Sequence, residues 1–188
     1  MCYNSDIHHR RTIRLRGYDY SWVGAYFITI CIRNGKHLFG HIVDGKMILN
    51  EYGIIAHNEW LKTHNIRSNV QLGEFIVMPN HVHGIIVITD NITVPRRGVL
   101  HTPPPTVVTN AGKGVCNTPL RSPSQTVGAI IRGYKTAVTK QLNQLACFGS
   151  VFQRNYHEHI IRNHRTHHHI ATYITNNPIN WENDEYKN

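Results

Sequence analysis

The sequence contains few cysteines and no long hydrophobic run. The four cysteines show no C-x-x-C pair and no dense framework, which indicates ordinary reduced thiols; they are Cys2, Cys31, Cys116 and Cys147. The longest apolar runs, "YFITICI" and "GIIVI", are far too short to span a bilayer, and no apolar signal-peptide region follows the basic N-terminus. These absences favour a cytoplasmic protein that does not bind a membrane.

Acidic residues are also scarce. Lys and Arg total 20 against 11 Asp and Glu, which gives a formal charge of +9, and 15 His add positive charge below neutral pH. Such an excess favours a polyanionic partner, either nucleic acid or an acidic surface, but it says nothing about the fold. The length of 188 residues fits one domain, 1–188, with a core of its own.

Apolar patterns predict an alternation of strands and helices. Runs rich in β-branched and aromatic residues predict core strands over residues 25–32, 70–80, 81–90 and 150–161. Apolar residues at helical spacing predict helices over residues 51–62 (capped by Asn50), from Ser124 as the cap to about Leu142, and over 165–177, before Pro178. A short hairpin is expected around Asp44-Gly45, a dipeptide suited to a tight turn.

This order predicts the fold class. Without the hairpin, it reads strand, helix, strand, strand, helix, strand and a last helix, which suits an α+β sandwich of the ferredoxin-like or RRM-like kind. We expect a mainly antiparallel sheet with helices on one face. Residues 1–17 form a basic N-terminal arm, and residues 90–124, rich in Pro, Thr, Gly and Asn, are expected to be a flexible insert within the domain.

The stretch "MPNHVHGIIVI" places two histidines in one predicted strand. Side chains at i and i+2 of a strand point to the same face, so His81 and His83 lie side by side. Such a pair can bind a divalent metal ion, but two ligands are too few, and a third must come from elsewhere in the chain. The alternative is that both are ordinary histidines, hydrogen-bonded to their neighbours.

The last predicted helix carries residues that can complete such a site. Tyr173 and Asn177 are four residues apart and share a helix face, with His169 one turn earlier. Because Pro178 disfavours α geometry in the residue before it, we expect the helix to end at Asn177 with its amide projecting off the terminus. The alternative is that Tyr173 only packs and "NNP" only stops the helix.

Three ordered motifs and the first strand resemble a known family. "MPNHVHGIIVI", "VFQRNYHEHIIRN" and "YITNNPINW", behind "GAYFITICIRN", resemble the REP-associated tyrosine transposases and related insertion-sequence transposases of the HUH class, named for a His-hydrophobic-His motif with a single catalytic tyrosine. The resemblance covers roughly Gly17 to Trp181 apart from the insert. It implies a metal-dependent endonuclease and strand transferase that cuts and rejoins single-stranded DNA beside hairpins of REP-like repeats through a 5′-phosphotyrosine.

The resemblance also implies roles for individual residues. Tyr173 is then the nucleophile, and His81, His83 and Asn177 are the metal ligands. The implied metal is Mg²⁺ or Mn²⁺, although the ligand types alone leave zinc open.

Basic and aromatic residues indicate where DNA binds. Arg10, Arg11, Arg14, Arg16, Tyr18 and Tyr20 form an interleaved cluster of the kind that holds single strands. The DNA contacts that we predict are Arg14, Arg16, Arg154, His159 and Arg162. His157 and His159 share a strand face and form a second pair, which either helps to position DNA or metal ligands or simply packs.

Two other functions fit the sequence. The first is a domesticated protein that binds DNA hairpins without cutting them. The second is an RNA-binding module, although the aromatic sheet motif of that class is absent. A monomer and a homodimer are equally consistent with the sequence.

Overall fold

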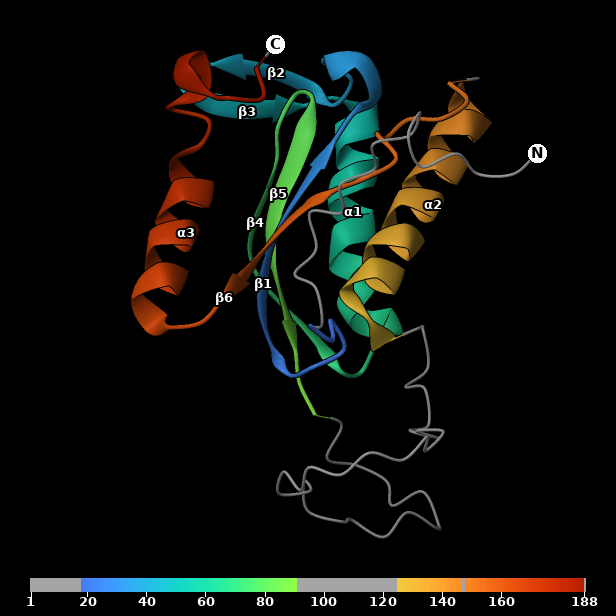
Figure 1. Ribbon diagram of the computed structural model, residues 1–188. Helices are drawn as coiled ribbons and strands as arrows, with labels where there is room; N and C mark the ends of the chain where they lie inside the picture. Colours follow the sequence, from blue (N-terminus) through green and yellow to red (C-terminus); the bar gives the residue numbers. More distant parts are fainter. Residues whose placement is uncertain (1–17, 91–124, 147, 188) are drawn as a thin grey trace, which may run out of the picture.

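The computed structural model describes residues 18–90, 125–146 and 148–187. The predicted N-terminal arm, most of the insert and the proposed cap Ser124 lie outside these residues. Four strands form one antiparallel sheet in the order β4-β5-β1-β6 (Figure 1); they are β1 (Gly24–Cys31), β4 (Val70–Val77), β5 (His81–Ile88) and β6 (His157–Ile161). The order of elements along the chain and in the sheet is that of a ferredoxin-like sandwich, so the predicted fold class is confirmed.

Two helices cover one face of the sheet. Helix α1 (Glu51–Ile66) begins where the Asn50 side chain accepts a hydrogen bond from the Gly53 amide at 2.9 Å. Helix α2 (Val127–Leu145) begins where the Thr126 side chain accepts a hydrogen bond from the Ala129 amide, and its apolar face packs into the main core. Gly84 of β5 permits the close approach of α1, because a Cβ there would lie 2.3 Å from Cζ2 of Trp60.

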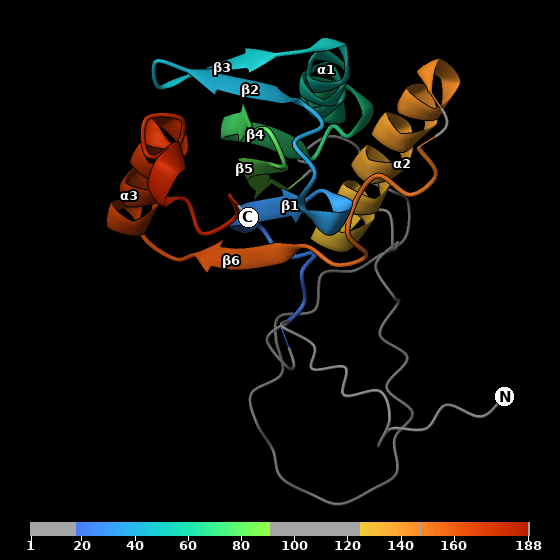
Figure 2. The same cartoon turned by 90° about the horizontal axis from the view of Figure 1, so that it is seen from above.

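The last helix departs from the prediction that the helices share one face. Helix α3 (His164–Asn176) lies across the opposite face of the sheet from α1 and α2 (Figure 2). Its two buried residues, Ile170 and Ile174, pack with Ile85 of β5 and Ile161 of β6 in a second, smaller core. The reason is that β5 is apolar on both faces, so each face needs a cover.

The small elements follow the expected turn chemistry. Strands β2 (Gly40–Val43) and β3 (Lys46–Leu49) form the separate hairpin, and both residues between them have positive φ, 49° at Asp44 and 69° at Gly45. The short helices η1 (Arg33–Gly35) and η3 (Trp181–Asn183) follow β1 and α3 respectively. None of the helices in the described ranges is both long and apolar enough to cross a membrane.

The last strand is shorter than the predicted range 150–161. Phe152 forms an isolated bridge with Ile32, but regular pairing begins only at His157. The Lys135 ammonium donates to the carbonyls of Gln153 and Asn155 at 2.9 and 2.8 Å, so those carbonyls bond to α2 and not to β1. Arg154, predicted at the start of a strand, therefore lies in a connecting segment.

Candidate metal and nucleophile site

The sheet register places His81 and His83 on the face that α3 covers. His83 lies opposite Thr29 of β1, and His81 lies opposite Cys31. Both histidines are buried, at 0% and 1% exposure, and their ring centroids are 4.4 Å apart. The predicted side-by-side arrangement is confirmed.

The Asn80 side chain determines which ring nitrogen of His81 carries the proton. The Asn80 amide nitrogen donates to the Tyr186 carbonyl, so its Oδ1 is the atom that faces His81 Nδ1, at 2.8 Å. An oxygen acceptor requires a proton on Nδ1, which leaves a lone pair on Nε2. This Nε2 is buried without a hydrogen-bond partner. Burial lowers the pKa of His81 to about 4 despite the opposing charge of Asp184, so the ring is neutral at pH 7.

His83 connects the sheet to α3. Its Nδ1 lies 2.8 Å from Thr29 Oγ1, and its Nε2 lies 3.3 Å from the Tyr173 hydroxyl. When Nδ1 donates to Thr29, the lone pair on Nε2 accepts from Tyr173. Burial, followed by the neighbouring His81, holds the pKa of His83 well below its usual range. Two neutral imidazoles therefore direct nitrogen lone pairs at one place, as metal-binding histidines do.

Tyr173 presents its phenol to this pair from α3. The side chain is 39% exposed, and its ring packs edge-on against Phe27 with centroids 6.1 Å apart. Burial raises the pKa of Tyr173 to about 12, and the negative charge of Asp184 contributes to the rise, whereas a hydrogen bond with Asn177 lowers it. At neutral pH the group is therefore a protonated phenol, and it needs activation to act as a nucleophile.

Asn177 lies one turn beyond Tyr173, but not in the predicted conformation. Its backbone is αR (φ −58°, ψ −40°) in spite of Pro178, because the chain continues turning, with the Asn180 amide donating to the Asn177 carbonyl at 3.1 Å. The side chain is buried and does not project off the terminus. Its Nδ2 donates to Asp184 Oδ2 at 2.8 Å, and its Oδ1 is buried without a hydrogen-bond partner.

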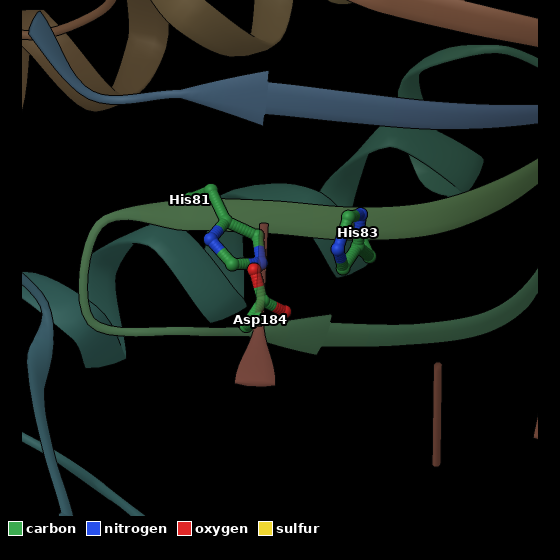
Figure 3. A group of neighbouring side chains, drawn as sticks. All are labelled: His81, His83 and Asp184. Atoms are coloured by element: carbon green, nitrogen blue, oxygen red, sulfur yellow. The ribbon is translucent and has the colours of Figure 1, made fainter. Parts of the chain in front are cut away.

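The segment after α3 supplies two groups that sequence reasoning missed. The carboxylate of Asp184 lies beside the His81 ring (Figure 3), and one ligand atom each from His81, His83 and Asp184 lie within 4.8 Å of one another. The Tyr186 ring packs against His81 and His83, with centroids 5.2 and 5.7 Å away. The run "WENDEYKN" has no periodicity that predicts this return to the sheet; only an acidic residue shortly after the tyrosine motif hinted at it.

The other predicted residues stand apart from this centre. His159 and His157 do share a face of β6, as predicted, and His157 reaches the Tyr186 ring at 6.0 Å. His169 is exposed on α3, and exposed positions also hold the predicted DNA contacts Arg154, His159 and Arg162. Arg14 and Arg16 lie outside the described residues.

The donor set fits a divalent cation. Two buried atoms, His81 Nε2 and Asn177 Oδ1, carry lone pairs that no hydrogen bond satisfies within the described part of the chain. A buried polar atom without a partner costs roughly 1–3 kcal/mol, so a bound ion would remove a penalty as well as add a bond. Imidazole nitrogens suit zinc and other transition metals, whereas amide oxygens suit Mg²⁺ and Mn²⁺, so this mixed donor set leaves the choice of metal open.

Comparison with known proteins gives a relative and a fold. An uncharacterized protein of Haemophilus influenzae is 40% identical over an alignment of 192 positions, gaps included, and the match covers 97% of this chain and 96% of that protein. The chain belongs to the same family as this Haemophilus protein. No family model matches the sequence.

Among solved structures, a REP-associated tyrosine transposase bound to a REP hairpin covers 90% of this chain and 73% of that chain, with a TM-score of 0.57 and 17% identity. The resemblance based on the motifs is thus confirmed at the level of the fold.

Proposed function

We propose that this family member is a transposase that cleaves and rejoins single-stranded DNA next to hairpins, with Tyr173 as nucleophile. The observation that supports this most is the Tyr173 hydroxyl 3.3 Å from His83 Nε2, next to a second buried histidine with a free lone pair. A nucleophile beside a cation site is the arrangement that phosphoryl transfer to an enzyme side chain requires.

The reaction exchanges one phosphodiester for another. The Tyr173 oxygen forms a bond to the scissile phosphorus and loses its proton, while the bond to the 3′ oxygen breaks and that oxygen leaves as a 3′-hydroxyl. The product is a 5′-phosphotyrosine. A second 3′-hydroxyl then attacks the phosphorus, reseals the strand and restores the phenol, so neither water nor ATP is consumed.

His81 Nε2, His83 Nε2 and Asn177 Oδ1 are the atoms that would hold Mg²⁺ or Mn²⁺. When bound, the ion supplies positive charge to the phosphate oxygens and favours deprotonation of the phenol. The lone pair of His83 Nε2 cannot bind a cation and accept the Tyr173 proton at once. The phenol must therefore give up its present hydrogen bond in the metal-loaded protein.

DNA hairpins are the proposed partner. The structure that shares this fold was solved with a REP hairpin, and the charge of +9 favours a polyanion. Arg154 and Arg162 are exposed on either side of the edge strand β6, where His159 is also exposed, so this edge is where we place DNA contacts. The predicted contacts Arg14 and Arg16 belong to the same proposal.

The test uses end-labelled single strands that contain hairpins from beside the gene, incubated with protein and Mn²⁺ or Mg²⁺ and resolved on a denaturing gel. Wild type should give a metal-dependent covalent protein–DNA band, and Tyr173→Phe should abolish it. Tyr186→Phe is the matched control, because this second phenol also lies against His83 but is not proposed to attack. It should keep the band.

One alternative function predicts a different result in this experiment. It is a protein that binds hairpins without cutting them, which the charge of +9 supports as well, because binding a polyanion does not require Tyr173 to attack. Hairpin binding with no covalent band in either metal would support that alternative and contradict the nuclease. A band that survives Tyr173→Phe and is lost in Tyr186→Phe would show that Tyr186, and not Tyr173, is the nucleophile.

A further inference from the structure

The segment after α3 brings one carboxylate to the histidine pair. Ligand atoms of Asp184, His81 and His83 lie within 4.8 Å of one another, and Figure 3 shows the carboxylate next to the His81 ring. Neighbouring ligand atoms around one octahedral cation are roughly 3 Å apart, and opposite ones roughly 4 Å. The three groups are thus already near the spacing of a shared ion.

Hydrogen bonds orient the Asp184 carboxylate and still leave lone pairs on both of its oxygens. Oδ2 accepts from Asn177 Nδ2 at 2.8 Å, and Oδ1 accepts from the Tyr186 amide at 2.6 Å. An ionised carboxylate has about four acceptor sites, so each oxygen keeps a lone pair. The group is oriented and still able to bind a cation.

The residues around Asp184 fix this segment against β5. Before it, the Trp181 ring lies 6.1 Å from the His81 ring, centroid to centroid. After it, the Tyr186 ring packs on both histidines and its carbonyl accepts from the Asn80 amide. Contacts on both sides mean that Asp184 reaches the site as part of an ordered segment.

Among the described residues, the Asp184 carboxylate has no basic side chain paired with it, and two nearby lone pairs accept no hydrogen bond. No Lys or Arg in residues 18–90, 125–146 and 148–187 forms an ion pair with its carboxylate. Independently, His81 Nε2, on a fully buried residue, and Asn177 Oδ1 have no hydrogen-bond partner there. A negative charge and two unsatisfied lone pairs at one place are satisfied together by a divalent cation.

We propose that Asp184 is a fourth protein ligand of the cation, beside His81, His83 and Asn177. This proposal rests on the proposed function for the presence of an ion at the site. Because two neutral imidazoles and an amide carry no charge, Asp184 supplies the only negative charge among these four ligands. The protein then binds the ion without DNA, and the ion fastens the C-terminal segment to β5.

The experiment measures Mn²⁺ binding to the full-length, DNA-free protein by isothermal titration calorimetry. Asp184→Asn keeps the shape and one of the two accepting oxygens but removes the charge, and it should weaken Mn²⁺ binding by at least about tenfold. Glu182→Gln is the matched control, since Glu182 belongs to the same segment but pairs with Lys187. It should bind Mn²⁺ as wild type does.

Hydrogen exchange of the wild type gives a second measurement that needs no variant. Mn²⁺ should slow amide exchange at residues 184–187 as well as in β5; slowing in β5 alone would overturn the proposal. Equal binding by wild type and Asp184→Asn, or equal weakening in both variants, would also overturn it. So would a wild type that binds no Mn²⁺ without DNA, although the nuclease would stand if the covalent band still forms, because phosphate can complete the ligand set.

Discussion

Thr29 and His83 face each other across the β1–β5 ladder, and their side chains are joined by a hydrogen bond of 2.8 Å between Oγ1 and Nδ1. The bond fixes which nitrogen of the buried His83 ring faces β1. It also leaves Nε2 directed at the site, where a cation is proposed to bind. The central strand thus determines how a ligand on its neighbour is presented.

Removing the Thr29 hydroxyl should therefore weaken metal binding. Thr29→Val keeps the shape of the side chain but leaves His83 Nδ1 without its partner, and we expect Mn²⁺ affinity to fall about 10- to 100-fold. Thr29→Ser keeps the hydroxyl and should retain most of the affinity. Calorimetry on the two variants measures this, and equal affinities would show that the hydrogen bond does not orient His83.

Acid should destabilise the metal-free protein through His81. The unfolded chain takes up a proton near pH 6.5, whereas the folded protein does so only near pH 4, so the unfolded state binds more protons between these values. Stability should thus be present above pH 6.5 and fall as the pH falls, by about 2 kcal/mol between pH 7 and pH 5 from this group. His83 adds to the effect in the same direction.

Urea unfolding in the presence of a chelator measures this dependence. His81→Gln cannot take up the proton and should lose about 2 kcal/mol less than wild type between pH 7 and pH 5. His168→Gln, which changes an exposed histidine of α3, is the control and should behave as wild type. The same loss in His81→Gln as in wild type would assign the acid sensitivity to other groups.

Replacing the basic residues beside β6 should change how DNA binding depends on salt. Each phosphate contact contributes a slope of about −0.7 in log K against log salt for single strands and about −0.9 for duplex. Arg154→Gln and Arg162→Gln should each make the slope shallower by about that amount while metal binding stays unchanged. Lys140→Gln, exposed on α2 across the sheet, should leave the slope as it is. Unchanged slopes in both Arg variants would move the DNA interface elsewhere.

Most of the fold could be predicted from the sequence because the caps, turns and apolar runs that define each element lie within a few residues of one another. The Asn50 cap, the Asp44-Gly45 turn and the apolar runs of β1 and β5 act within a few residues, and each was found where it was expected. The position of α3 was not local. It depends on the second apolar face of β5, and the prediction that all helices share one face of the sheet left this face without a cover.

The candidate site was predictable where spacing alone determines direction. His81 and His83 follow from a period of two, and Tyr173 and Asn177 follow from one helical turn. Asp184 and Tyr186 reach the site through an irregular segment, held by contacts with Asn80, Asn177 and the histidine rings. The contacts of Tyr186 with Asn80 and His81 join residues more than 100 positions apart, and no local pattern encodes them.

The two apolar cores hold different parts of the site, and opening each part requires a different free energy. β5 lies inside the sheet, with β4 and β1 paired along both its edges, so moving the histidines requires breaking both of these ladders. Tyr173 sits on a helix held by the smaller core, and opening of that helix alone carries the phenol away. In the proposed reaction, the tyrosine that becomes bonded to DNA therefore lies on an element that can open alone, while the histidine pair lies inside the sheet.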